Sequence, residues 1–231
     1  MARIIITIPG SWGNDPAIET PFTLRVVPAD YESLVDIVAV GRKSEALTDD
    51  QVGRLRKAPA LLEAELTFEK PGDRAAAAAA ARLAADAFAA GAEAVFVETS
   101  LRVFGVETLK GVELDDANTL FHLFVEILMD DEAHEVTTEG LQCFDLPDVV
   151  VAYAPRDEES AAAAQATAFS LAAQMVCDRL RPTNGGVFRA SESAPWYRLK
   201  LDLPPTDTAG PVDDDPFVNP RGRWVLTLRK A

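Results

Sequence analysis

Two alanine-rich segments, each preceded by an apolar run, constrain the fold of this chain most strongly. The first unit places an apolar run at residues 64–68, turn residues at 71–73 and seven consecutive alanines at 75–81. The second repeats the order about 86 residues later, at residues 149–153, 155–157 and 161–164. Alanine has the highest helix propensity, and its small side chain lets a helix approach a sheet closely. Each unit therefore predicts a strand followed by a helix.

A short apolar run follows each alanine-rich segment, at residues 94–97 and 186–188. The sequence thus predicts an α/β (α+β) protein of two related strand–helix–strand halves, with helices on one face of a mixed or antiparallel sheet. A tandem ferredoxin-like arrangement is the most specific form of this prediction. We expect one compact domain, with halves at about 1–104 and 119–231 and a proline-rich loop at 203–222.

Apolar patterning and end signals place the remaining elements. Asp73 and Asp157 are suited to cap the two alanine-rich helices, and Gly91 is suited to end the first. Thr48 or Asp49 is suited to begin another helix. The helices are expected at residues 48–57, 74–90 and 158–180, and the strands at 3–8, 35–40, 61–69, 148–154, 196–201 and 223–228.

Residues 120–129 are ambiguous between strand and helix. Apolar side chains fall at every second position from Phe121 to Met129, which favours a strand with His122 on its other face. A helix capped by Asp115 or Asp116 is the alternative. We favour the strand, because residues 130–133 are typical of a turn and 135–138 of a return strand, which together predict a hairpin.

The net charge of −15 is concentrated in one part of the chain. Residues 107–159 contain 15 acidic and two basic side chains, a charge of −13, whereas the remainder has 22 acids and 20 bases, a charge of −2. Such a segment repels phosphates, so we expect no nucleic-acid partner. A basic protein or a cation is the natural complement, although a solvated surface that aids solubility is the simpler interpretation.

Two sets of side chains are candidates for a site. Six acids of the charged segment are expected to contact a partner: Asp130, Asp131, Glu132, Glu135, Glu139 and Asp145. Trp12, in a glycine-containing loop after the first strand, and His122 are expected to line a ligand cleft between the halves. For each, a structural role is the alternative: Trp12 in a tight turn, His122 on a strand, and the acids in a solvated hairpin.

The sequence nominates no catalytic residues, no metal site and no cofactor. The chain has two histidines, and the carboxylates around His134 match no calcium or zinc spacing. Cys143 and Cys177 are too few for a disulfide framework, which fits a reducing, cytoplasmic setting. We expect both to be small hydrophobic residues of the core. No membrane-spanning segment is expected, since the alanine-rich stretch carries Arg82 and Asp86.

Residues 138–148 carry a recognisable signature. Thr138, Gly140 and Leu141 are followed by Phe144, then by Pro147 and Asp148 at the start of a strand. This segment resembles a bacterial family of unknown function with Thr-x-Gly-Leu or Thr-x-Gly-Met, then Phe-Gly, then Pro-Glu or Pro-Asp. The resemblance extends over roughly residues 60–200, and the chain departs from it with Asp145 in place of glycine. It implies a bacterial, cytoplasmic protein and carries over no catalytic residue.

The signature itself is interpreted as a determinant of folding, in which Gly140 permits a turn with positive φ. Two functions remain open. The first is a non-catalytic binding or regulatory protein, such as an antidote, that presents its acidic surface to a basic protein. The alternative is an enzyme or a small-molecule or cation binder with its site between the halves. The sequence leaves the oligomeric state and the identity of partner or substrate undetermined.

Overall fold

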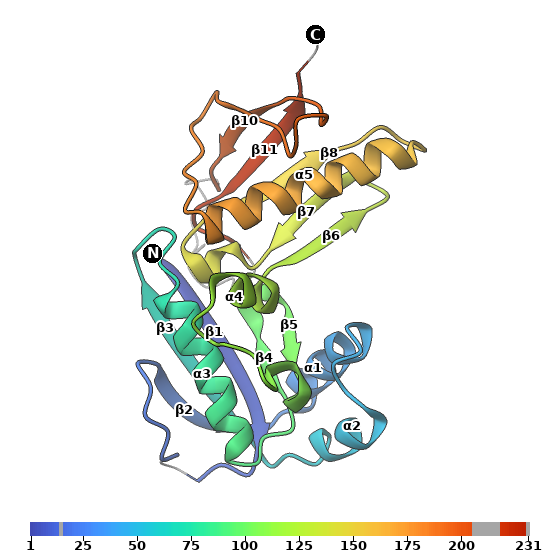
Figure 1. The fold of residues 1–231 in the computed structure, drawn as a ribbon. Coiled ribbons are helices and arrows are strands. Elements are labelled where there is room, and N and C mark those ends of the chain that lie inside the picture. The colour runs from blue at the N-terminus through green and yellow to red at the C-terminus, as the bar shows by residue number, and fades with distance from the viewer. Residues whose placement is uncertain (14–15, 205–217, 230–231) are drawn as a thin grey trace.

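The computed structural model describes residues 1–13, 16–204 and 218–229. It contains helices and two sheets, so the predicted α/β class is confirmed. Figure 1 shows α3 lying across the first sheet and α5 across the second, with α4 between them. Most of the predicted loop at 203–222 falls outside the described residues.

The first sheet is antiparallel and has the strand order β2-β3-β1-β4-β5. Ile4, Ile6 and Ile8 of its central strand are fully buried on one face. The strands are β1 (Ala2–Gly10), β2 (Thr23–Pro28), β3 (Ala60–Phe68), β4 (Val95–Val97) and β5 (Arg102–Phe104).

Helix α3 (Ala75–Ala89) covers the isoleucine face of this sheet. Arg74, and not the predicted Asp73, is the N-cap residue, although the Asp73 carboxylate accepts a hydrogen bond from the Ala75 amide at 3.2 Å. Gly91 follows the helix at a φ of 96°. Seven alanines between Ala76 and Ala87 are buried, together with Leu83. The small side chains therefore pack the helix closely against the strands, as the sequence predicts.

Residues 35–40 form part of a helix, so the predicted strand there is wrong. Helix α1 (Tyr31–Lys43) buries Leu34, Ile37 and Val38 and leaves Val35 exposed, which is helical rather than alternating spacing. Helix α2 (Asp49–Leu55) follows, with Thr48 as its cap. Both helices pack with Phe96 and Val103, on the face of the first sheet opposite to α3. Helices therefore cover both faces of this sheet.

Residues 117–130 change from helix to strand within one apolar run. Helix α4 (Ala117–Phe124) begins where the Asp116 carboxylate accepts a hydrogen bond from the Thr119 amide at 2.8 Å. Strand β6 (Glu126–Asp130) then pairs with β7 (Glu135–Glu139). The predicted hairpin is confirmed, but the predicted strand is wrong over its first half, where the capped alternative holds. Short 3-10 turns lie nearby: η1 (Glu98–Ser100), η2 (Val106–Leu109) and η3 (Leu141–Phe144).

The second sheet is mixed and has the order β6-β7-β8-β11-β10-β9. Strand β8 runs parallel to β11, and the other neighbours are antiparallel. Helix α5 (Glu158–Cys177), capped by Asp157, packs on one face of β7 and β8. The remaining strands are β8 (Asp148–Ala152), β9 (Val187–Phe188), β10 (Tyr197–Asp202) and β11 (Arg223–Leu228).

The strands of the two strand–helix–strand units have different places in the strand orders of their sheets. Strands β3 and β4 run parallel and are separated by one strand, β1. Strands β8 and β9 also run parallel but are separated by β11 and β10. The tandem ferredoxin-like arrangement is therefore not confirmed. One hydrophobic cluster nevertheless extends from Ile4 in β1 to Leu226 in β11 and joins the two sheets.

Candidate functional site

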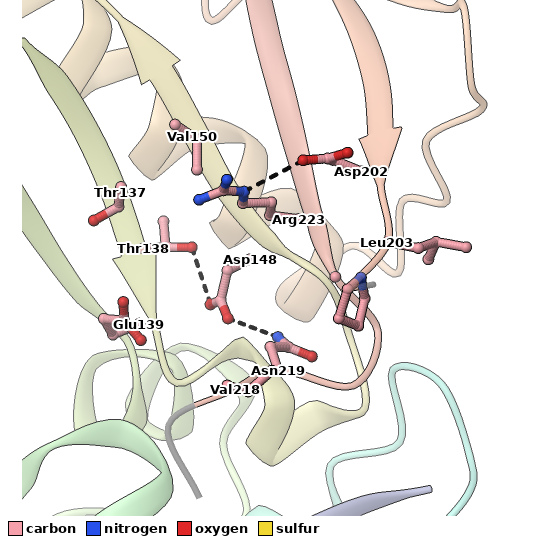
Figure 2. Close-up of a pocket in the computed structure, with 12 residues that line it drawn as sticks. Thr137, Thr138, Glu139, Asp148, Val150, Asp202, Leu203, Val218, Asn219 and Arg223 are labelled. Carbon is pink, nitrogen blue, oxygen red and sulfur yellow. Dashed lines mark hydrogen bonds and ion pairs between the residues drawn. The ribbon is translucent and has the colours of Figure 1, made fainter. Parts of the chain in front are cut away.

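A pocket of about 290 Å³ lies on the face of the second sheet that is turned away from α5 (Figure 2). Val149 and Val151 of β8 point into the core with α5, so the alternate residues Asp148 and Val150 point into the pocket. We call it the Asp148 pocket. Its lining residues are Thr137, Thr138, Glu139, Asp148, Val150, Asp202, Leu203, Pro204, Val218, Asn219, Gly222 and Arg223.

Charged side chains cross this sheet in one row. In register, Glu126 of β6 lies opposite Glu139 of β7. Asp148 of β8 lies opposite Arg223 of β11, which in turn lies opposite Asp202 of β10. Directly opposed side chains on neighbouring strands are close enough to interact. Among its described lining residues, the pocket therefore has acidic side chains on one side and one arginine, Arg223, beside them.

The Asp148 carboxyl group is held by donors from three segments. Oδ1 accepts hydrogen bonds from the Thr138 hydroxyl and the Leu141 amide, both at 3.2 Å. Oδ2 accepts a hydrogen bond from Asn219 Nδ2 at 2.6 Å. Figure 2 shows Thr138 and Asn219 reaching Asp148 from two sides. These three hydrogen bonds fix the orientation of the Asp148 carboxyl group.

A hydrogen bond joins the two ends of the signature, Thr138 and Asp148. The Thr138 hydroxyl also accepts a hydrogen bond from the Val149 amide at 2.8 Å, so it joins β7 to β8. Gly140 lies at a φ of 97°, as predicted, and a Cβ atom there would overlap the Phe124 carbonyl oxygen. The signature is a determinant of folding that also places two pocket carboxylates.

Burial and charge repulsion act together on the two acids of the pocket. Burial, and next the neighbouring Glu139 charge, raise the pKa of Asp148 to about 7 against its three hydrogen bonds. The pKa of Glu139 is also raised, first by burial and then by Glu126. Perturbed carboxyl groups in a concave site are typical of functional positions.

The basic side chains near the row pair with other acids. Arg102 pairs with Glu126 at 3.5 Å, and Arg223 Nε lies 3.7 Å from Asp202 Oδ2. Among the residues that the structure describes, no basic side chain forms an ion pair with Glu139 or Asp148. The pocket therefore contains two adjacent acids whose charge is not balanced by those residues.

Asp145 does not belong to an accessible surface, so its predicted role in partner binding is wrong. Its side chain is 0% exposed and accepts two hydrogen bonds from Arg221, at 2.5 and 2.7 Å. Its φ of 54° lies in the left-handed region that glycine adopts most readily. Asp145 anchors the segment that carries Asn219 to the turn before β8.

The other predicted acids fall in two places. Asp130, Asp131 and Glu132 are exposed at the tip of the β6–β7 hairpin, and Glu135 begins β7 beside them. The Asp130 carboxylate accepts hydrogen bonds from the Glu132 and Ala133 amides, at 2.9 and 2.8 Å, and shapes the turn. Glu139 lies at the other end of β7, in the Asp148 pocket.

Trp12 and His122 do not share a pocket. Trp12 lies over the end of β1, donates a hydrogen bond to the Ile8 carbonyl at 2.8 Å, and lines a separate pocket of about 230 Å³ with Arg54 and Lys57. His122 is exposed on helix α4, not on a strand, and contacts the rings of Phe121 and Phe169. The predicted cleft residues are therefore not brought together.

Sequence reasoning missed Asp148, Thr138, Asn219 and Arg223 as site residues. The sequence did contain a signal for Thr138 and Asp148, because in the signature a hydroxyl group and a carboxylate lie on either side of a turn. No local signal marks Asn219 and Arg223, which reach the pocket from a segment about 70 residues away in the chain. Cys143 is a buried core residue, as predicted, and burial raises the pKa of its thiol to about 12.

Within the described ranges, no group of three or more His, Cys, Asp and Glu side chains is arranged to hold a metal ion. No helix in that part of the chain has the length and apolar character needed to cross a membrane. A scan against protein-family models finds no match, and searches of curated proteins and of solved structures find none either. The family resemblance at residues 138–148 stays a prediction.

Proposed function

We propose that the protein binds a small organic cation in the Asp148 pocket. One observation carries the proposal: Glu139 and Asp148 lie side by side in a cavity, and no basic side chain of the described residues pairs with either. Burial is the main cause that raises the pKa of both groups, and a neighbouring acid adds to it, Glu139 for Asp148 and Glu126 for Glu139. An ammonium group between them would relieve this repulsion and gain charge-assisted hydrogen bonds.

The walls of the pocket favour an organic cation over a bare ion. Val150, Leu203, Pro204 and Val218 supply apolar surface beside the two acids. Small-molecule sites commonly combine such walls with a few polar groups that fix orientation. A volume of about 290 Å³ is just below the usual range for ligand pockets, roughly 300 to 1,000 Å³, so the ligand is small.

Calorimetric titration with n-butylammonium at pH 8, where Asp148 is ionised, tests the proposal. We expect measurable binding, and Glu139→Gln should weaken it at least about tenfold, a loss of about 1.4 kcal/mol. Asp131→Asn removes one negative charge at the exposed hairpin tip and serves as the matched control, with little effect on affinity. Absence of binding to the unaltered protein, or equal losses in both variants, would contradict the proposal.

A basic protein partner at the hairpin tip is the second candidate. It is supported by the exposed Asp130, Asp131 and Glu132, which extend beyond the sheet on one turn. Opposite charge would accelerate association and make it sensitive to salt. A pull-down at low salt should recover a basic protein, and charge removal at all three positions should abolish its capture. Capture that persists in this triple variant would contradict the candidate.

Both candidates are binding functions rather than catalysis. The cytoplasmic setting is likewise a proposal, and it is supported by the free thiols of Cys143 and Cys177.

A further inference from the structure

Arg223 is the one basic residue that lines the described part of the Asp148 pocket. It lies opposite Asp148 in register, and Figure 2 shows its guanidinium group beside Val150, with Nε on the side of Asp202. Only Nε faces Asp202, at 3.7 Å, and the two side chains are 56% and 47% exposed. An exposed pair of this geometry contributes little to stability, so Arg223 remains available to another acceptor.

A guanidinium group can bind a carboxylate through two parallel hydrogen bonds. Arg223 therefore offers a pole for an anionic group beside the acidic pole of Glu139 and Asp148. Neighbouring strands lie roughly 4.8 Å apart, so the two poles are separated by about that distance at their backbones. A ligand that spans them needs its charges several bonds apart.

We propose that the ligand of the Asp148 pocket is zwitterionic, a short ω-amino acid whose ammonium group meets Glu139 and Asp148 and whose carboxylate meets Arg223. This inference rests on the proposed function, because it adds a second pole to the same site. The apolar side chains of Val150 and Leu203 would contact the methylene groups between the two charges. A phosphate would be repelled by the row of acids, whereas a single carboxylate bound by Arg223 carries less charge.

Three probes of equal chain length separate the two poles. We would titrate n-butylammonium, 4-aminobutanoate and butanoate into the full chain at pH 8 by calorimetry. The account predicts that 4-aminobutanoate binds at least tenfold more tightly than n-butylammonium, and that butanoate binds more weakly than either. If n-butylammonium binds and 4-aminobutanoate binds no more tightly, the zwitterionic ligand is excluded and the proposed cation site stands. If neither binds, both proposals fail.

Arg223→Gln gives a second test, because it should change the affinities of two probes in opposite directions. Loss of the guanidinium group should weaken 4-aminobutanoate binding at least tenfold, while n-butylammonium should bind more tightly, because a nearby positive charge is gone. A merely structural role of Arg223 would weaken both. Arg198→Gln, an exposed arginine on β10 outside the pocket lining, is the matched control and should change neither affinity. Parallel losses for both probes in Arg223→Gln would overturn the inference.

Discussion

The carboxyl group of Asp148 combines a raised pKa with three hydrogen bonds that favour its ionised form. Burial and Glu139 outweigh those bonds, so the folded state holds its proton up to about pH 7, whereas an unfolded chain releases it near pH 4. Between these values the folded state binds more protons than the unfolded state. The contribution of Asp148 to stability is therefore complete below pH 4 and is lost as the pH rises through 7.

Asp148→Asn should remove this dependence on pH. We expect the free energy of unfolding of the unaltered protein, relative to the variant, to fall from pH 4 to pH 7 with a slope of at most about 1.4 kcal/mol per pH unit. Urea unfolding at several pH values measures it, with Asp131→Asn as the exposed control. A difference between protein and variant that rises or stays constant over this range would show that Asp148 is ionised throughout.

Gly140 should tolerate no side chain. Gly140→Ala places a Cβ atom against the Phe124 carbonyl oxygen at a φ of 97°, whereas Gly185→Ala meets nothing within 4 Å at a φ of 81°. Left-handed backbone costs an L-residue roughly 1 to 2 kcal/mol, and overpacking adds roughly 1 to 3 kcal/mol. Urea unfolding should therefore show a loss at Gly140 about twice that at Gly185 or more. Equal losses would mean that only the backbone angle matters.

At the scale of elements, an ion pair between Arg221 and the buried Asp145 anchors the segment from residue 218 to 222. Arg221→Gln leaves the Asp145 charge buried without its partner, and breaking such a pair costs roughly 3 to 5 kcal/mol. Arg25→Gln breaks a pair with Glu63 in which the arginine is largely exposed, and should cost at most about 1 kcal/mol. Thermal or urea unfolding measures both.

A rescue variant distinguishes the buried charge from lost packing. Adding Asp145→Gly to Arg221→Gln removes the unpaired carboxylate and suits the φ of 54°. We expect this double variant to regain part of the lost stability. A double variant less stable than Arg221→Gln alone would argue that packing, and not charge, holds this segment.

Elements with strong local signals were predictable from the sequence, and those decided by tertiary contacts were not. Capping residues and alanine content placed α3 and α5 to within a few residues. The apolar pattern of residues 120–129 fits both a strand and a helix, and the cap at Asp116 favours a helix up to Phe124. The pocket depends on pairing of β8 with β11, a contact between Asp148 and Arg223 that no local pattern encodes. Of its two acids, the sequence predicted Glu139 as a binding residue, but not Asp148 or the residues that hold Asp148.

At the scale of the whole molecule, one core joins the two sheets, so they should unfold together. Trp12 reports on the first half and Trp224 on the second, and both pack in the same hydrophobic cluster. Two variants, each retaining one of these tryptophans and both lacking Trp196, should show coincident fluorescence transitions in urea. Circular dichroism of the same samples provides the control for secondary structure. Two separated midpoints would mean that the halves are independent domains.

The central claim is that Glu139 and Asp148 form the cation-binding side of one pocket, and a side-chain carboxyl ¹³C titration by nuclear magnetic resonance tests it most directly. Without ligand, the account predicts a pKa of about 7 for Asp148 and a raised pKa for Glu139. Saturating n-butylammonium should lower both, because a bound cation favours the ionised carboxylates. Unshifted pKa values without ligand, or values that n-butylammonium leaves unchanged, would contradict the account.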